Sequence, residues 1–486
     1  MNKVLGKGTA YVMGASLIFV LCNYLIHVGL ARKLGPAEYG LFGIVSSLYL
    51  LSTAFLTTGI PRAAARAIAS NPKETDSIMH SAIKLQLIFA SIISLLYLVL
   101  AFFIAPVILH DQSITKYIIL VGLSSIPFGV VILYQNGLFN GQRLFKKQAL
   151  TLIAHSLLRV IFVFVTIFIG GKVFGVFIAF FLAALLTIFL CFYINKNKET
   201  PIQNYPYLKI ISFATPLTIA AVALTFIRDG NVLIIKSILH DNVLAGLYTS
   251  ALTLSDLPYL VFAGVSLTLM PSIAKAIAEN NILLTKKYIS QTLRYLLLFL
   301  LPLIALLAAN AKVFLHFFFS DQYASATPIL QLLALSSLFL IFTLTLTSIT
   351  TGGGKPTIEM VVYLSMVCVL VPLNIILLPS FGLIGAALAL TAATFSSLCV
   401  MSVLVYRKFH SLIPFSSTLK ISLSSFLLFL LAPYLPYHGP FFVLTHFLLL
   451  ALYGCILFVF KEITPQDLAL FKDMLQPNKA TLQQNL

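Results

Sequence analysis

Long apolar stretches alternate with short polar breaks along the whole chain. The breaks carry turn residues or charge, as in "KLGPAE" at 33–38, "SNPKETDS" at 70–77, "NGQRLFKK" at 140–147 and "SDQYASATP" at 320–328. Because a helix needs about 20 apolar residues to cross the hydrocarbon core of a bilayer, the pattern predicts about fourteen transmembrane helices. We expect them to begin near residues 10, 38, 78, 114, 148, 173, 210, 243, 286, 327, 357, 381, 416 and 440.

Composition supports a membrane protein. Of the 486 residues, 60% are hydrophobic and 9% are charged, and the mean hydropathy is +1.02, which lies outside the usual range of soluble globular proteins. All five cysteines fall within apolar stretches, where a cysteine acts as a small packing residue. No disulfide, metal site or cofactor is expected.

The placement of positive charge predicts the orientation of the chain. The 31 lysines and arginines outnumber the 14 aspartates and glutamates, and cytoplasmic loops of membrane proteins collect Lys and Arg. Most of these residues fall on the side that holds the N-terminus, every second loop and the C-terminal tail. The opposite side holds only Arg32, Lys33, Lys116, Lys172 and Lys312. Both termini are therefore expected to be cytoplasmic, and the charge excess does not indicate a nucleic-acid partner.

The chain also resembles itself at a nearly constant offset. "PAEYGLF" at 36–42 resembles "NVLAGLY" at 242–248, and "VFGVFIA" at 173–179 resembles "LIGAALA" at 383–389. The offset of about 206 to 210 residues corresponds to six spans. Six is an even number, so both repeats enter the membrane in the same orientation and are expected to be related by an axis along the membrane normal.

These observations predict an all-α polytopic membrane protein with two parallel six-helix repeats that form two lobes, followed by two C-terminal helices. The expected parts are an N-terminal six-helix lobe over 1–205, a C-terminal six-helix lobe over 206–410, two additional transmembrane helices over 411–461 and a cytoplasmic tail over 462–486.

Polar residues within the spans are the candidate site. A charged side chain inside the membrane is costly and usually faces a protein interior or a water-filled cavity. We expect Arg228 and Asp229 near the middle of the seventh span, with Asp256 at comparable depth in the eighth. The predicted substrate-binding residues are Arg228, Arg159, Asp229, Asp256, Asn23 and His27.

A structural role is the alternative for each of these residues. Arg228 could form an interhelical pair with Asp256, and Asp229 could pair with a neighbouring cation. Asn23, His27 and His155 could be interior polar residues with satisfied hydrogen bonds. Two other basic residues, Lys236 and Arg294, lie close enough to the ends of their spans to extend toward the interface.

Two stretches resemble a known family. The stretch 228–276, with its aspartate in the seventh span and "AGLYTSAL" at the start of the eighth, looks like the corresponding helices of the polysaccharide-transport (Wzx-like) flippases. "LGPAEYGLF" at 34–42 is similar to their first inter-helix turn. These flippases belong to the MOP superfamily, together with the MATE multidrug exporters and the lipid II flippases.

The resemblance implies two lobes around a V-shaped cavity in a prokaryotic cell membrane. It further implies translocation of a polyprenyl-diphosphate-linked oligosaccharide by alternating access, in cell-surface polysaccharide biosynthesis. Arginine suits a diphosphate because its fork of donors binds phosphate oxygens in pairs. Expected partners are the lipid-linked glycan, membrane lipids, and the glycosyltransferases and polymerase of the same pathway.

Other functions remain as alternatives. The first span, 10–31, lacks the acid that prokaryotic MATE exporters commonly use and the Arg-Asp pair typical of lipid II flippases, which weakens both relatives without excluding them. A membrane glycosyltransferase or polymerase would generally need a sizeable extramembrane loop, and the predicted connections are short. "TTGGGKP" at 350–356 departs from a phosphate-binding loop at Ile349 and Pro356. We therefore expect a transporter rather than an enzyme, with a channel as the third class.

Overall fold

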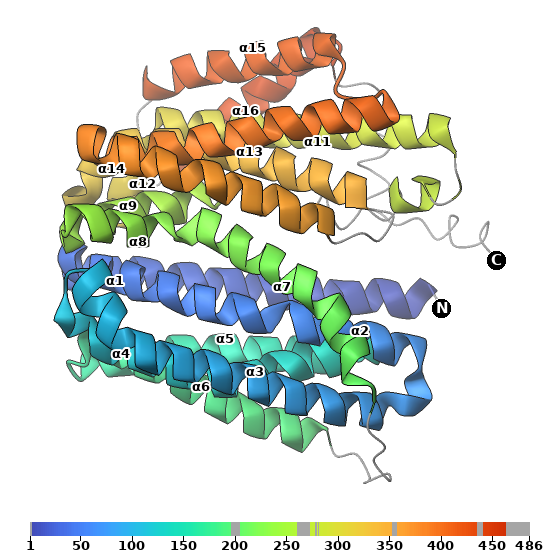
Figure 1. Cartoon of the computed structure of the whole chain (residues 1–486). Coiled ribbons are helices and arrows are strands. Elements are labelled where there is room, and N and C mark those ends of the chain that lie inside the picture. Colours follow the sequence, from blue (N-terminus) through green and yellow to red (C-terminus); the bar gives the residue numbers. More distant parts are fainter. Residues whose placement is uncertain are drawn as a thin grey trace. The chain divides into compact units, whose positions relative to one another are not determined.

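The computed structural model describes residues 2–195, 205–259, 273–277, 279, 281–351, 357–434 and 441–462. Over these residues the chain is helical, with no strand (Figure 1). Most of the stretch "TTGGGKP" and the predicted cytoplasmic tail beyond residue 462 lie outside the described residues.

The helices pack as two compact units. The first comprises Met1–Leu254, Leu315–Ile329 and Gly354–Ser397, and the second comprises Ser255–Phe314, Leu330–Gly353 and Leu398–Leu486. The predicted lobe boundaries at 205 and 410 stay predictions. The helices are α1 (Asn2–Thr57), α2 (Gly59–Ser70), α3 (Thr75–Phe103), α4 (Thr115–Ile132), α5 (Phe145–Phe168), α6 (Lys172–Ile194), α7 (Tyr207–Asp229), α8 (Asn231–Leu239), α9 (Asn242–Ser255), α11 (Ile282–Ala309), α12 (Ala311–Phe318), α13 (Thr327–Thr351), α14 (Thr357–Phe409), α15 (Phe415–Leu431) and α16 (Phe441–Val459).

Ten helical stretches within the described residues are long and apolar enough to cross a membrane. Two of them, Ala10–Ser70 and Thr357–Phe409, each contain two predicted spans. The reason is that α1 and α14 are each two helices that meet at a non-helical glycine, Gly35 with φ 78° and Gly382 with φ 56°. The other two predicted spans correspond to shorter helices, α9 and α16. The prediction of an all-α polytopic membrane protein is confirmed.

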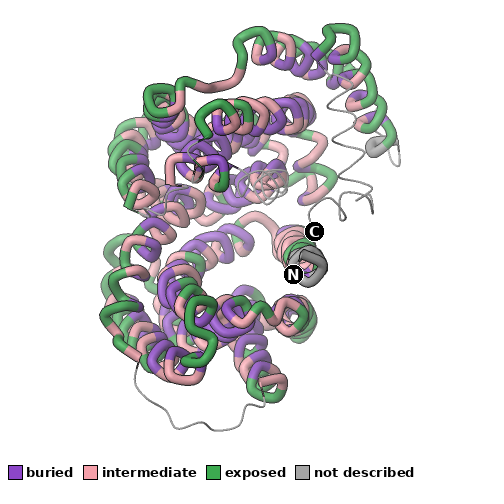
Figure 2. Tube along the Cα trace, turned by 90° about the vertical axis from the view of Figure 1, so that its right-hand side faces the viewer, coloured by how far each residue is buried: buried purple, intermediate pink, exposed green. Residues whose placement is uncertain are grey.

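The exposed surface of the helices is apolar. Large hydrophobic side chains are exposed on many helices, among them Phe102 at 70%, Phe168 at 79% and Phe189 at 69%. Figure 2 shows the buried residues on the sides of helices that face other helices, with exposed residues on the outward sides. Apolar outward faces are expected where lipid tails, rather than water, surround the helices.

Two glycines from matching positions of the repeat meet where α1 crosses α9. A Cβ atom on Gly40 would lie 1.7 Å from the carbonyl oxygen of Asn242, and a Cβ atom on Gly246 would lie 2.1 Å from the carbonyl oxygen of Pro36. The two similar segments place Pro36 in register with Asn242 and Gly40 in register with Gly246. Each glycine therefore contacts the residue that corresponds to its partner's own neighbour, so the two contacts are equivalent. A two-fold relation between the segments requires this equivalence.

The same crossing shows the direction of the two helices. One helical turn further along, a Cβ atom on Gly43 would lie 2.2 Å from Oγ1 of Thr249, and these two positions are also in register in the repeat. Positions that match in the repeat thus meet at two places, one helical turn apart. Only helices that run in the same direction can do this, so the two helices are parallel at this crossing, as the parallel repeat predicts.

Two basic residues connect helix ends within the first unit. Arg32, near the end of the first half of α1, donates to the carbonyl oxygens of Phe317 and Phe318. The Lys236 ammonium in α8 lies 3.5 Å from a carboxylate oxygen of Asp111, and the Lys236 side chain is only 4% exposed. Lys236 is therefore buried in an ion pair, and its ammonium also donates to the carbonyl oxygen of His240, just beyond the end of α8.

The second unit contains a group of three charges around the buried Glu462 carboxylate. Arg294 of α11 donates through Nε to the Glu462 carboxylate at 2.8 Å, and Lys420 of α15 lies 3.7 Å from the other oxygen of the same carboxylate. The Glu462 side chain is 5% exposed and directly follows α16. The group joins α15 and the end of α16 to α11, so Arg294 has a structural partner instead of extending to solvent.

We expect Glu462→Gln to destabilise the second unit, because it removes the carboxylate charge that the largely buried Arg294 and the partly exposed Lys420 share. Loss of one partner from a buried ionic group costs on the order of 3 kcal/mol. The melting temperature of the purified protein, followed by circular dichroism, should fall by several degrees. Glu279→Gln is the matched control, since Glu279 forms only an exposed pair with Lys275 at 3.8 Å. Equal melting temperatures for the two variants would contradict this role.

Candidate functional site

Arg159 is held between aromatic rings inside the first unit. It lies midway along α5, half-buried, and its guanidinium carbon is 4.0 Å from the centroid of the Phe180 ring in α6 and 5.9 Å from that of Phe19 in α1. A cation over an aromatic face is attracted by the ring quadrupole, which offsets part of the cost of desolvation. The two rings position the guanidinium without using its hydrogen-bond donors.

No carboxylate in the described part of the chain forms an ion pair with Arg159, and none of the described residues accepts a hydrogen bond from it. Its Nε atom is buried without a hydrogen-bond partner. Since a guanidinium has five N–H donors and no acceptor, Arg159 retains both a full charge and the capacity to bind an anion.

The predicted residues of α1 lie near this cation. Phe19, Asn23 and His27 are spaced by four residues and therefore share one face of the helix. Phe19 contacts Arg159, and the buried His155 lies one turn before Arg159 in α5. The structure thus turns the α1 face that carries Asn23 and His27 toward Arg159.

His27 also belongs to a hydrogen-bond network that links both halves of α1 with α9. Its Nδ1 atom lies 2.9 Å from the hydroxyl of Tyr39 and 3.3 Å from Oγ1 of Thr253. The hydroxyls of Tyr39 and Thr253 are 3.3 Å apart, and Tyr24 donates to the carbonyl oxygen of Thr253 at 3.0 Å. The Nδ1 side of the His27 ring is therefore hydrogen-bonded, as expected for an interior polar residue with a structural role. His27 also shares the α1 face that lies toward Arg159.

Arg228 and Asp229 end α7 and are both half-buried. The Asp229 carbonyl oxygen accepts a hydrogen bond of 2.9 Å from Ser47 of α1. No hydrogen bond or ion pair joins Arg159 to either residue within the described part of the chain. The predicted site is thus divided into an Arg159 group and an Arg228 group.

Beside Arg228 lies a buried amide network that the sequence did not predict. The Asn231 amide donates to the hydroxyl of Tyr248 at 2.9 Å, and the Asn374 amide donates to the side-chain oxygen of Asn231 at 3.1 Å. All three side chains are fully buried, and they connect α8, α9 and α14. Isolated asparagines within apolar stretches were the only available signal, and the two lie 143 residues apart in the sequence.

Asp256 follows the end of α9 and lies in a turn over 256–258, half-buried. The helix that begins the eighth predicted span thus ends one residue before Asp256. Pro258 is consistent with this turn, because it has no backbone N–H to donate to the preceding helical turn. Asp256 belongs to the second compact unit, so its proposed relation to Arg228 stays a prediction.

Within the described residues, no group of three or more His, Cys, Asp or Glu side chains is placed to hold a metal ion. The polar groups that the site helices present are cations, amides and hydroxyls among apolar side chains.

Comparison with known proteins identifies the family. A sequence model described as polysaccharide biosynthesis protein matches residues 5–276, more than half of the chain, and the MatE model matches residues 216–377. The uncharacterized membrane protein MJ1375 of Methanocaldococcus jannaschii is 24% identical over 405 residues, which cover 79% of this chain and 93% of that protein.

Solved structures show the same fold. The lipid II flippase MurJ in an inward closed conformation matches with a TM-score of 0.76 at 17% identity, over 94% of this chain and 99% of that chain. A MATE family multidrug resistance transporter of the MOP superfamily, in an inward-facing conformation, matches with a TM-score of 0.66 at 17% identity, over 81% of this chain and 94% of that chain. The matched structures are transporters rather than catalytic enzymes. The chain therefore belongs to the polysaccharide biosynthesis protein family and has the fold of these transporters.

Proposed function

We propose that this transporter is a flippase that moves a polyprenyl-diphosphate-linked oligosaccharide from the cytoplasmic to the outer leaflet, for the synthesis of a cell-surface polysaccharide. The observation that carries the proposal is Arg159, a cation within membrane helices that two aromatic rings hold and no described carboxylate neutralises. In the low dielectric of such a site, an unneutralised guanidinium favours an anionic ligand.

A diphosphate suits the donors of both groups. A guanidinium binds two phosphate oxygens at once, and such charge-assisted hydrogen bonds are roughly twice as strong as neutral ones. Arg228 would supply a second cation at the end of α7, while Asn23 and His27 would offer polar contacts to the first sugars. Asp229 and Asp256 would serve to couple transport to an ion, and the apolar outer faces of the helices would accommodate the polyprenyl chain.

Two other transporters of the superfamily are alternative functions. For a MATE-type multidrug exporter, an unneutralised Arg159 would disfavour cationic drugs by electrostatic repulsion. A lipid II flippase also carries a polyprenyl diphosphate, so Arg159 does not distinguish it from the proposed function. The glycan attached to the diphosphate is the difference between these two substrates.

The proposal includes a location and partners. We place the chain in the prokaryotic cell membrane with both termini in the cytoplasm, on the basis of the distribution of Lys and Arg between the two sides. The enzymes that build the oligosaccharide on the inner leaflet, and the polymerase that consumes it on the outer leaflet, would be the functional partners.

The test compares three substrates in proteoliposomes that contain the purified chain. Lipid-linked oligosaccharide, lipid II and a fluorescent cationic drug are each assayed for movement between leaflets or across the membrane. We expect flux of the lipid-linked oligosaccharide above that in protein-free liposomes, with little movement of the drug. Preferred flux of lipid II, or drug export driven by an ion gradient, would replace the proposed function by the corresponding alternative.

We expect Arg228→Lys to retain part of the flux and Arg228→Ala to retain little, because lysine keeps the charge but loses the paired donors. Membrane abundance of each variant serves as the control for insertion. If Arg228 only pairs with Asp256, the double variant Arg228→Ala with Asp256→Asn should regain flux, since it leaves no unpaired charge. Such a rescue, or full flux in Arg228→Ala, would remove Arg228 from the substrate site.

A further inference from the structure

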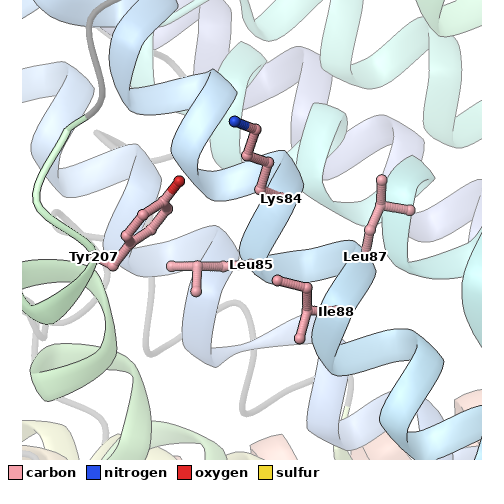
Figure 3. Close-up of a pocket in the computed structure, with 5 residues that line it drawn as sticks. All are labelled: Lys84, Leu85, Leu87, Ile88 and Tyr207. Carbon is pink, nitrogen blue, oxygen red and sulfur yellow. The ribbon is translucent and has the colours of Figure 1, made fainter.

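A groove lies on the outward face of α3, near the start of α7. Its lining residues are Lys84, Leu85, Leu87 and Ile88 of α3 together with Tyr207, the first residue of α7, and its volume is about 500 Å³. This volume falls within the roughly 300–1,000 Å³ range of ligand sites. Figure 3 shows the Lys84 ammonium and the Tyr207 hydroxyl on the same side of the groove, with Leu85 and Ile88 beneath them.

Two hydrogen bonds fix the position of Tyr207 relative to α3. The Ser81 hydroxyl donates to the carbonyl oxygen of Tyr205 at 3.1 Å, and the Tyr205 backbone N–H is 2.9 Å from the same hydroxyl oxygen. Ser81 is fully buried, one turn before Lys84 in α3. The groove is therefore formed by two chain segments that are attached to each other, rather than by a free surface of one helix.

The polar end of the groove is positively charged. Lys84 is exposed, and in the described part of the chain it forms neither a hydrogen bond nor an ion pair. Two further cations lie on α2 and α7, the helices that pack with α3. Arg66 of α2 is 4.6 Å from the Phe213 ring of α7, and Lys209 of α7 is 5.9 Å from the Tyr205 ring. No described carboxylate forms an ion pair with either of them.

The charged and apolar parts of the groove follow the layers of a lipid leaflet. Side chains of an α-helix tilt toward its N-terminus, and the N-terminus of α3 is on the side predicted to be cytoplasmic. Lys84 lies nine residues into α3, about 14 Å along its axis, so its long side chain reaches back toward the phosphate layer. Leu87 and Ile88 lie one turn deeper and are 38% and 57% exposed, at the level of the acyl chains.

We propose that this groove binds one anionic phospholipid of the cytoplasmic leaflet. The lipid phosphate accepts hydrogen bonds from the Lys84 ammonium and the Tyr207 hydroxyl, and the upper part of one acyl chain lies against Leu85, Leu87 and Ile88. The apolar lining covers little more than one helical turn, which suits the beginning of an acyl chain better than a long polyprenyl chain. Arg66 and Lys209 favour an anionic over a zwitterionic head group. The inference does not depend on the proposed substrate.

The experiment measures lipid binding to the purified full-length chain by native mass spectrometry. Phosphatidylglycerol and phosphatidylcholine are added at equal concentration to the wild type, to Lys84→Ala and to Lys146→Ala. Lys146 is an exposed lysine in the first turn of α5, on the same predicted side of the membrane, and is not part of the groove. Melting temperatures of the three proteins establish that each is folded.

We expect the wild type and Lys146→Ala to bind phosphatidylglycerol in preference to phosphatidylcholine. The amount of phosphatidylglycerol bound to Lys84→Ala should be at least about fivefold lower than that bound to the wild type. Tyr207→Phe should cause a smaller loss, and Ile88→Trp should reduce binding by filling the groove. Equal binding by the two lysine variants, or equal binding of the two lipids by the wild type, would overturn the proposal. Displacement of phosphatidylglycerol by polyprenyl phosphate at equal concentration would assign the groove to the substrate instead.

Discussion

Replacement of Arg159 by alanine is expected to reduce flux of the lipid-linked oligosaccharide at least about tenfold, because a charge-assisted hydrogen bond to a buried ligand contributes on the order of 1.5–3 kcal/mol. Arg159→Lys should retain an intermediate flux, since it keeps the charge but loses the paired donors and the planar contact with Phe180. Flux into the outer leaflet of proteoliposomes, corrected for the amount of inserted protein, is the measurement.

Thermal stability separates a functional from a structural role for Arg159. Arg159 has no counter-ion among the described residues, so its replacement by alanine removes an uncompensated charge from the membrane helices. The melting temperature of Arg159→Ala should therefore stay unchanged or rise. Arg407→Ala, which removes an exposed arginine near the end of α14, should preserve both flux and stability. A lower melting temperature together with normal specific flux would assign Arg159 to the structure alone.

Replacement of Gly40 by alanine is expected to destabilise the protein by about 3 kcal/mol or more, at the upper end of the costs of overpacking. The new methyl group would lie 1.7 Å from the backbone oxygen of Asn242, and backbone cannot rotate away as the end of a side chain can. The α1–α9 crossing would have to separate. Melting temperature and the yield of folded protein after detergent extraction measure the effect.

Gly14→Ala is the matched control, because Gly14 lies in the same helix and a Cβ atom there would meet nothing within 4 Å. It should be neutral or stabilising by up to about 1 kcal/mol, since alanine is the better helix former. Gly246→Ala should resemble Gly40→Ala, and the double variant should cost less than the two single costs combined, because one separation of the helices relieves both clashes. Additive costs, or a neutral Gly40→Ala, would contradict the reciprocal crossing.

The pattern of apolar stretches along the chain was sufficient to predict the fold class. Span length is set by bilayer thickness, so a count of apolar stretches predicts the helices, even where α1 and α14 continue through two spans. The repeat offset also predicted which glycines are in register, because a parallel duplication preserves the order and direction of its parts. Gly40 and Gly246 could be paired from the sequence for this reason.

The interaction partners of the polar residues could not be predicted from the sequence. Lys236 was expected to extend toward the interface, yet it pairs with Asp111, 125 residues away. Arg294 pairs with Glu462, 168 residues away, and the amide network of Asn231 and Asn374 had no signal beyond two isolated asparagines. Hydropathy shows that a polar group lies inside a span, but it carries no information on which neighbouring helix supplies the partner.

The sequence by itself therefore determined the class of protein, the number of spans and the parallel repeat, because these depend on length, hydropathy and order along the chain. Only the tertiary structure decided that Arg159 lies between Phe19 and Phe180 without a described carboxylate, whereas Lys236 and Arg294 are neutralised by ion pairs. The physical reason is that a charged side chain in a membrane finds a counter-ion only if another helix, distant in sequence, packs beside it in the right rotation. Rotation and packing are set by close side-chain contacts between helices, and the apolar pattern of a single helix does not determine them.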